Sequence, residues 1–252
     1  MLTSMVKITD LHKSFDDLVV LNGVSLNVEM GQNMVVFGRS GTGKSVLLKC
    51  LMRLMIPDSG EIFIKDKNVL NLNPKELNDL RKDIGFLFQG SALYDSMSVR
   101  ENLEFPLVRN FNLEQDEIKD RVHRVLEAVD LSDAIDKMPS ELSGGMRKRI
   151  GLARSIITKP KLMLYDEPTT GLDPITSKEI STLIVDLQHA FKMTSIVVTH
   201  DVLCAKIIAD CAIVLEGGHI VHEGTIKELL TAEDPFLKNF FSDEVINNNG
   251  RN

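Results

Sequence analysis

The sequence predicts an α/β fold with a mostly parallel sheet, an antiparallel β edge and an inserted helical part. Three observations predict this fold. Short apolar, β-branched runs recur along the chain and later alternate with helical patterns, as in parallel sheets with helices on their faces. A glycine-rich segment joins one such run to a helical stretch. Between Gln89 and Pro160 the strand signal disappears, and apolar residues recur at helical spacing instead.

The expected strands are short runs with few polar residues. In Leu162–Tyr165 and Ile196–Val198 the apolar character is unbroken, which is typical of central strands buried on both faces. Val24–Val28 and Met34–Phe37 flank a short turn, and we expect them to form an antiparallel hairpin at the front edge. The full set is Val24–Val28, Met34–Phe37, Glu61–Lys65, Ile84–Phe88, Leu162–Tyr165, Ser195–Thr199 and Ala212–Leu215.

The pattern divides the chain into three parts. Residues 1–89 and 159–235 are expected to form the α/β core together with the β edge. Residues 90–158 hold the helical insert. Residues 236–252 form a C-terminal tail that we expect to be partly disordered, because its polar end has little to bury. In the insert, one helical face carries Ile118, Val122, Val125, Leu126 and Val129.

Composition and charge narrow the class of protein. The 252-residue chain is 43% hydrophobic and 26% charged, as in folded globular proteins. Its 29 Lys and Arg against 36 Asp and Glu give a net charge of −7, so nucleic acid is not an expected partner. The 3 cysteines have no Cys-x-x-Cys spacing, which excludes a disulfide framework and fits a reducing, cytoplasmic compartment. No run approaches the about 18 apolar residues of a membrane span, so membrane work would need another chain.

The glycine-rich segment that follows Met34–Phe37 predicts a nucleoside triphosphate site. Its backbone N–H groups can face an anion, and the helix expected over Val46–Met55 points the positive end of its dipole at the same place. Lys44 would reach the β and γ phosphates, and the Ser45 hydroxyl would coordinate Mg²⁺. A chance glycine-rich turn is disfavoured, because the strand before and the helix after are both present. The expected nucleotide-binding residues are Gly38, Arg39, Ser40, Gly41, Thr42, Gly43, Lys44, Ser45 and Val46.

Two adjacent carboxylates, Asp166 and Glu167, follow the apolar run Leu162–Tyr165. In parallel sheets functional groups gather at the carboxyl ends of strands. Asp166 would hold the Mg²⁺ shell, and Glu167 would polarise a water for attack on the γ-phosphate, which favours hydrolysis over binding alone. The alternative is that both only solvate the strand end. His200 follows Ser195–Thr199 in the same way and could donate a hydrogen bond to the γ-phosphate.

A second glycine pair opens another expected helix, within Leu142-Ser143-Gly144-Gly145-Met146. Its N-terminus is a further anion site that one bound nucleotide does not need in addition to the phosphate loop. With these motifs in order, the chain resembles an ATP-binding cassette (ABC) ATPase over about residues 5–235, and Leu142–Met146 resembles the signature motif of that family. The resemblance implies a RecA-like P-loop NTPase core.

The resemblance also implies roles for single residues. Phe15 resembles the aromatic residue that stacks on adenine, although Tyr is the commoner occupant. Gln89 resembles the glutamine that senses Mg²⁺ and the attacking water. Asp173, in Gly171-Leu172-Asp173, resembles the loop through which two subunits communicate. In the family two cassettes associate head to tail, so that Ser143, Gly144, Gly145 and Met146 of one close over the ATP of the other.

The cassette resemblance therefore implies a homodimeric ATPase that depends on ATP and Mg²⁺. Its implied catalytic residues are Lys44, Gln89, Glu167 and His200, and its implied Mg²⁺ ligands are Ser45, Gln89 and Asp166. The head-to-tail dimer is implied by the family alone, since the chain could in principle fold back to bring both glycine segments together.

Finer features resemble the ATPases of bacterial Mla/Mce-type lipid-trafficking transporters. These features are the stretch Phe88–Pro106, Met146 in place of the common Gln, and Val46 in place of Thr. The resemblance implies transport of phospholipids or related lipids between membranes, with the chain at the cytoplasmic face of the inner membrane. It implies permease subunits contacted through the region after Gln89, and a periplasmic lipid-binding subunit. Two roles are open for the apolar residues in this region: they either bind a short permease helix or belong to the core of the helical insert. These residues are Leu93, Tyr94 and Met97.

Two other functions remain open. One is the ATPase of an importer for small solutes such as amino acids. The other is a nontransport cassette that uses ATP as a clamp or scaffold. The single cassette and the lack of a long coiled coil disfavour ribosome-acting and DNA-repair cassettes. The companion chains of the native complex would separate these functions.

Overall fold

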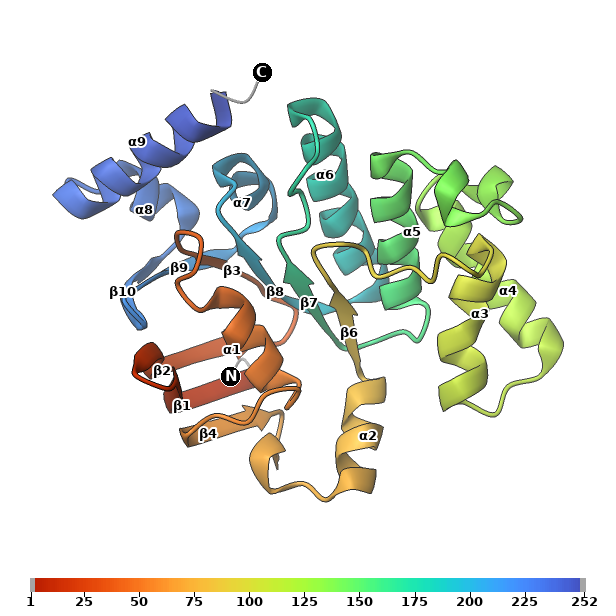
Figure 1. The fold of residues 1–252 in the computed structure, drawn as a ribbon, viewed down its shortest axis with the longest axis horizontal. Helices are drawn as coiled ribbons and strands as arrows, with labels where there is room; N and C mark the ends of the chain where they lie inside the picture. Colours follow the sequence, from red (N-terminus) through yellow and green to blue (C-terminus); the bar gives the residue numbers. More distant parts are fainter. Residues whose placement is uncertain (1–2, 250–252) are drawn as a thin grey trace. The chain divides into compact units, whose positions relative to one another are not determined.

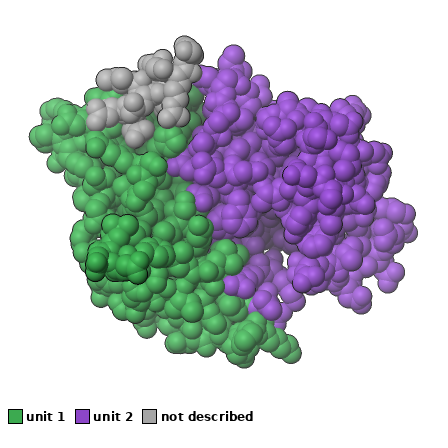
Figure 2. Space-filling view, in the orientation of Figure 1, with its two compact units in different colours: residues 1–77, 194–252 green, residues 78–193 purple. Residues whose placement is uncertain are grey.

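The computed structural model describes residues 3–249 of the chain, and side chains as far as residue 242 (Figure 1). Contacts between Cα atoms divide the chain into two compact units, residues 1–77 with 194–252 and residues 78–193, which Figure 2 colours separately. Each unit is therefore described by itself. The division into a core, an insert over 90–158 and a tail stays a prediction.

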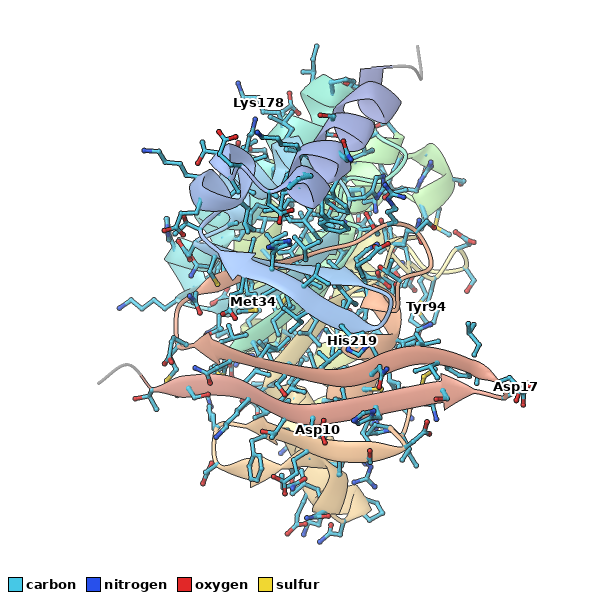
Figure 3. All side chains as sticks on the ribbon, turned by 90° about the vertical axis from the view of Figure 1, so that its left-hand side faces the viewer. Asp10, Asp17, Met34, Tyr94, Lys178 and His219 are labelled. Carbon is cyan, nitrogen blue, oxygen red and sulfur yellow. The ribbon has the colours of Figure 1, made fainter. Side chains whose placement is uncertain are left out.

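The first unit contains the predicted antiparallel β edge, as a four-stranded sheet. The order of its strands is β2-β1-β4-β5. The longest strand pair is β1 with β2, which run antiparallel from Ser4 opposite Glu29 to Phe15 opposite Leu18. Asp17 lies at the tip of this hairpin and Asp10 lies midway along β1 (Figure 3). Side chains alternate across the sheet, so that apolar ones such as Val6 and Ile8 are buried. The strands are β1 (Ser4–Phe15), β2 (Leu18–Glu29), β4 (Ser59–Ile64) and β5 (Lys67–Asn68).

The predicted hairpin of Val24–Val28 with Met34–Phe37 is wrong. The first run belongs to β2, which pairs with β1, whereas the second is β3 (Asn33–Phe37), which pairs in parallel with β8 (Thr194–Thr199) and β9 (Cys211–Glu216). All five side chains of β3 are buried. A strand buried on both faces gains more from two distant parallel neighbours than from the adjacent half-exposed strand.

The second sheet of this unit carries the predicted parallel core. β3 lies between β8 and β9, and β10 (His219–Gly224) pairs antiparallel with β9. All six side chains of β8 are buried, as its unbroken apolar run predicts. The helices of this unit are α1 (Lys44–Leu51), α7 (Val202–Ile208), α8 (Ile226–Thr231) and α9 (Pro235–Asn249). The helix expected over Val46–Met55 thus starts and ends earlier. It ends before Arg53, which adopts a left-handed φ of 47° that does not continue a helix.

The C-terminal part predicted to be partly disordered is helical as far as Asn249; residues 250–252 lie outside the described residues. The helix α9 is held by aromatic contacts. Phe240 and Phe241 lie with ring centroids 6.3 and 5.4 Å from that of Phe37, the last residue of β3. Burial of these apolar side chains offsets the entropy of ordering the segment.

Replacing Phe240 by Ala is expected to lower the free energy of unfolding by about 3–5 kcal/mol, since its ring is 1% exposed and leaves a cavity behind. Urea unfolding of the full chain measures this loss. The matched control is Val221→Ala on β10, where the side chain is 43% exposed and little should change. Equal midpoints for wild type and Phe240→Ala would contradict the packing of α9 on Phe37.

The second unit contains the predicted helical insert. Figure 1 shows α3, α4 and α5 side by side, and no strand occurs between residues 88 and 161. Two parallel strands flank this insert in sequence, β6 (Ile84–Leu87) and β7 (Leu162–Asp166), with Ile84 opposite Leu162. The helices are α3 (Val99–Asn110), α4 (Gln115–Ala128), α5 (Gly144–Ile156) and α6 (Pro174–Phe191), while α2 (Pro74–Lys82) lies at the boundary of the two units in sequence. Among residues 3–249, no helix has the length and apolar character needed to cross a membrane.

Candidate active site

The predicted phosphate loop connects β3 to α1 in the first unit. The Lys44 Nζ donates to the backbone oxygens of Gly38 at 2.6 Å and Arg39 at 3.0 Å, so the loop curls around its own ammonium group. Lys44 is 6% exposed and is the first residue of α1. The loop, the ammonium and the helix N-terminus are thus concentrated at one place, as binding of an anion requires.

Two glycines of this loop have no room for a side chain. A Cβ on Gly43 would lie 2.8 Å from the backbone oxygen of Val20, and φ at Gly43 is +97°. A Cβ on Gly38 would lie 2.7 Å from the backbone oxygen of Leu215. The backbone therefore approaches its neighbours more closely than any other residue type permits.

His200 comes to the same edge of this sheet as the phosphate loop. Phe37, which precedes the loop, is paired with Thr199, which precedes His200. The next residue, Asp201, caps α7 by accepting hydrogen bonds from the backbone N–H groups of Leu203 at 2.8 Å and Cys204 at 3.2 Å. Parallel register alone brings the two sequence motifs together in the first unit.

Gln89, Asp166 and Glu167 lie at one edge of the strand pair in the second unit. Leu87 is paired with Tyr165, so the residues after β6 and β7 leave the sheet at the same end. Asp166 is 7% exposed. Glu167 adopts a left-handed φ of 50°, a costly conformation that is common at functional sites. Its Oε2 accepts a hydrogen bond from the Thr170 hydroxyl at 3.3 Å.

Lys148 joins this group, although the sequence gives no sign of it. It lies in the basic run Arg147–Arg149, which has the pattern of a solvated face, yet its side chain is 5% exposed. Its Nζ donates to the backbone oxygen of Gln89 at 2.5 Å. Burial lowers the pKa of Lys148, and the negative charges of Glu167 and Asp166 oppose that shift.

The signature segment and the communication loop also meet in the second unit. Ser143 caps α5, accepting a hydrogen bond from the Met146 N–H at 3.3 Å, and both Ser143 and Gly144 are exposed. Asp173 caps α6, accepting hydrogen bonds from the Thr176 hydroxyl and backbone, which hold its pKa below the usual range. A Cβ on Gly145 would lie 3.0 Å from the Thr176 Cγ2. The two helix N-termini are therefore neighbours, and that of α5 is exposed.

Phe15, the predicted adenine-stacking residue, ends β1 with 41% of its surface exposed. The Lys13 Nζ lies 5.4 Å from the centre of its ring. An exposed aromatic ring of this kind offers a face on which a base can stack.

The residue types predicted as ligands fit Mg²⁺. Ser45 in the first unit carries a hydroxyl and Asp166 in the second carries a carboxylate, and both are hard oxygen donors of the kind that Mg²⁺ prefers. Among residues 3–249 no group of three His, Cys, Asp or Glu side chains could hold a metal by itself. Mg²⁺ does not need one, because phosphates and water complete its shell.

The fold and these motifs define an ATP-binding cassette. The family model described as ABC transporter matches residues 21–170, more than half of the chain, and the chain therefore belongs to the ABC transporter family. It is an ATPase that uses ATP with Mg²⁺ as the nucleotide-binding subunit of a transporter. ABC ATPases dimerise and work with membrane permease subunits.

Its relatives fall into several transport systems. The chain is 38% identical over 94% of its length to the probable ribonucleotide transport ATP-binding protein mkl of Mycobacterium leprae, covering 68% of that protein. It is 38% identical over 96% of its length to the intermembrane phospholipid transport system ATP-binding protein MlaF of Haemophilus influenzae, covering 91% of it. It is 38% identical over 88% of its length to the methionine import ATP-binding protein MetN of Rhizobium johnstonii, covering 61% of it.

A solved structure agrees with the fold. The dimeric structure of a post-hydrolysis state of the ATP-binding cassette MJ0796, bound to ADP and Pi, superposes with a TM-score of 0.79. The two chains are 31% identical, and the match covers 88% of this chain and 99% of the other. The prediction of an ABC ATPase fold is confirmed.

Proposed function

We propose that this chain is the ATPase of a bacterial transporter that moves phospholipid or a related lipid between membranes through a separate permease. The observation that carries the proposal is the 38% identity to MlaF along 96% of this chain and 91% of that protein. In the proposal the chain works at the cytoplasmic face of the inner membrane. A periplasmic lipid-binding subunit completes the complex.

The proposed chemistry needs positioning and charge stabilisation rather than covalent catalysis. Lys44 and the backbone N–H groups of the phosphate loop bind the β and γ phosphates, and Phe15 stacks on the adenine. When Mg²⁺ is bound with the nucleotide, Ser45, Gln89 and Asp166 would hold it, and its charge would offset that of the phosphates. Glu167 accepts the proton of the attacking water.

Further residues complete the proposed site. His200 donates a hydrogen bond to the γ-phosphate. This hydrogen bond stabilises the negative charge that develops there in the transition state. The exposed N-terminus of α5, with Ser143 and Gly144, binds the ATP held by a second copy of the chain. Asp173 lies in the loop through which the two ATP sites of the dimer are coupled. Because the γ-phosphate bridges two chains, its hydrolysis removes the bridge and lets them separate.

A cavity in the second unit supports the proposed permease contact after Gln89. It has a volume of about 730 Å³ and is lined by residues of α2, β6, the segment after β6, α3 and α5. Phe86 and Phe88 stack at 4.1 Å between ring centroids, and both line it. Tyr94 is 42% exposed, while Leu93 and Met97 are half-buried. Tyr94 is thus available to a partner beside this cavity, and the other two are shared with the core.

The charge of the cavity indicates what kind of segment it takes. Its lining includes Arg81, Lys82, Arg109 and Arg154 and contains no Asp or Glu, although the whole chain has a net charge of −7. Positive walls with apolar rings favour an occupant that carries both carboxylates and apolar side chains. We therefore propose that the permease segment bound here is acidic.

The proposal is tested by purifying the native complex from membranes with a tag on this chain and identifying its companions. A permease together with a lipid-binding subunit is the expected result. A permease with a soluble solute-binding protein would instead indicate a small-solute importer, and the absence of any membrane protein would indicate a nontransport clamp. Either of these results contradicts the lipid function.

The charge of the cavity has its own test in the same purification. Arg109 lies on the exposed end of α3 and would face the bound permease segment. Arg109→Glu is expected to reduce the recovered permease at least about tenfold, because a contact between like charges across an interface costs several kcal/mol. Arg124→Glu on the exposed face of α4 is the matched control and should recover as much permease as wild type. Equal recovery with both variants would contradict an acidic partner at this cavity.

A specific observation favours the importer as the second candidate. The chain is as similar to MetN as to MlaF, at 38% identity, though over 61% of MetN against 91% of MlaF. The companion chains decide between them.

A further inference from the structure

The segment that follows Gln89 has an unusual backbone. Ser91 and Ala92 both adopt left-handed φ values, 63° and 50°, although neither is glycine. Each such residue costs about 1–3 kcal/mol and persists only where surrounding contacts hold it. The two occur in succession, so the contacts that hold this segment must be specific.

One face of α5 supplies these contacts. Lys148, Gly151 and Arg154 recur every three residues and so lie on the same side of the helix. Lys148 donates through Nζ to the backbone oxygen of Gln89, and Arg154 donates through Nη1 to that of Ala92, each at 2.5 Å. Between them, α5 and the segment approach so closely that a Cβ on Gly151 would lie 3.0 Å from the Ser91 Cβ.

The far end of the segment is tied to α3. Asn102, which is fully buried, accepts a hydrogen bond from the Tyr94 N–H at 2.8 Å and donates to the Tyr94 oxygen at 3.1 Å. The ring of Tyr94 packs on that of Phe105, with 5.1 Å between the ring centroids. The Arg154 guanidinium lies 4.7 Å from the centroid of the Tyr94 ring. Residues 89–94 are therefore held by hydrogen bonds at both ends. Lys148 and Arg154 of α5 donate to the backbone oxygens of Gln89 and Ala92, and Asn102 of α3 bonds to the backbone of Tyr94.

We propose that Lys148 and Arg154 are positioning residues that hold the backbone of residues 89–92, and with it the amide of Gln89, in the conformation needed for catalysis. The inference rests on the proposed role of Gln89 and adds the device that sets its position. Lys148 is suited to this task because its buried ammonium has the Gln89 oxygen as a direct acceptor and the carboxylates of Asp166 and Glu167 as countercharges.

The same contacts couple two parts of the site. Ser143 caps the helix that carries Lys148, so the exposed N-terminus of α5 and the backbone of Gln89 are attached to one rigid element.

The test replaces Lys148 by Met, which keeps the length of the stem and removes the ammonium. We expect kcat for ATP hydrolysis to fall about 10- to 100-fold, as for other residues that orient a metal-site group. The Kd for ATP should stay within about twofold, and half-activation should need more Mg²⁺. Amide hydrogen exchange over residues 89–94 should become faster. Lys148→Arg, which retains a charged donor, should recover much of kcat.

Two further variants keep the outcome interpretable. Lys119→Met, on the exposed face of α4, is the matched control and should leave kcat, Mg²⁺ activation and exchange unchanged. Arg154→Met removes the hydrogen bond to the Ala92 oxygen at a half-buried position. It should speed amide hydrogen exchange over residues 89–94 with a smaller loss of kcat, and it replaces Lys148→Met in the test if that variant does not fold.

The failures of the two proposals are distinguishable. If exchange over residues 89–94 and Mg²⁺ activation are the same in wild type, Lys148→Met and Arg154→Met, the positioning role is overturned. If instead Gln89→Ala hydrolyses ATP at the wild-type rate, the role of Gln89 fails, and exchange still reports whether α5 holds the segment. A lower melting temperature with normal kcat per folded molecule would identify Lys148 as merely structural, which also overturns the proposal.

Discussion

Glu167→Gln is expected to bind ATP as tightly as wild type and to hydrolyse it about 10²–10⁴ times more slowly, the range lost when a general base is removed. The amide has the shape of the carboxylate but cannot accept a proton from water. The left-handed backbone of residue 167 and its contact with Thr170 should persist, since Gln can also accept the Thr170 hydrogen bond. With hydrolysis blocked, ATP remains as the bridge and the variant should accumulate as a nucleotide-bound dimer.

Phosphate release and size-exclusion chromatography in ATP and Mg²⁺ measure the two expectations for Glu167→Gln. Glu127→Gln on the exposed face of α4 is the control for loss of a carboxylate as such, and should match wild type in both measurements. Equal turnover by wild type and Glu167→Gln would refute the proposed general base. Slow turnover without a dimer would retain the base and refute the bridging role of ATP.

Lys44→Met is expected to lose most of the affinity for ATP. The ammonium lies inside the phosphate loop, 2.6 Å from the Gly38 oxygen, where it can transfer its hydrogen bonds from the loop to the phosphates. A hydrogen bond to a charged group contributes about 1.5–3 kcal/mol, so each one lost weakens binding by about 10- to 10²-fold. Calorimetric titration with ATP in Mg²⁺ buffer measures this change.

The control for Lys44→Met is Lys49→Met, at the other end of the same helix, which should bind ATP normally. Thermal unfolding without nucleotide separates binding from folding, since Met retains the apolar stem of the buried side chain. Unchanged affinity in Lys44→Met would remove the phosphate site on which the ATPase assignment of these residues depends.

Local patterns predicted the parts of this protein whose cause lies within a few residues. The unbroken apolar runs Leu162–Tyr165 and Ile196–Val198 became buried parallel strands, because both faces of such a strand are covered and must be filled by apolar side chains. The helical spacing from Ile118 to Val129 became a helix with that face buried. The glycines of the phosphate loop were identifiable because the close approach at Gly43 tolerates no other residue.

Strand pairing was the part that local patterns could not supply. Only three residues separate the end of β2 at Glu29 from the start of β3 at Asn33, yet the partners of β3 are β8 and β9, near the other end of the chain. Nearness in sequence favours a hairpin, and only the gain from burying β3 on both faces reverses that preference. The helical C-terminus is a similar case, because Phe240 and Phe241 are ordered by Phe37 and by each other.

The sequence by itself determined the family of this protein, because the motifs that define the family keep fixed spacings along a loop or at a strand end. The tertiary structure alone decided which strands pair, that Lys148 is buried against Gln89, and that α5 holds the strained backbone of Ser91 and Ala92. These contacts join segments far apart in the chain, and the free energy that selects them is burial and hydrogen bonding in the folded state, which leaves no periodic mark on the sequence.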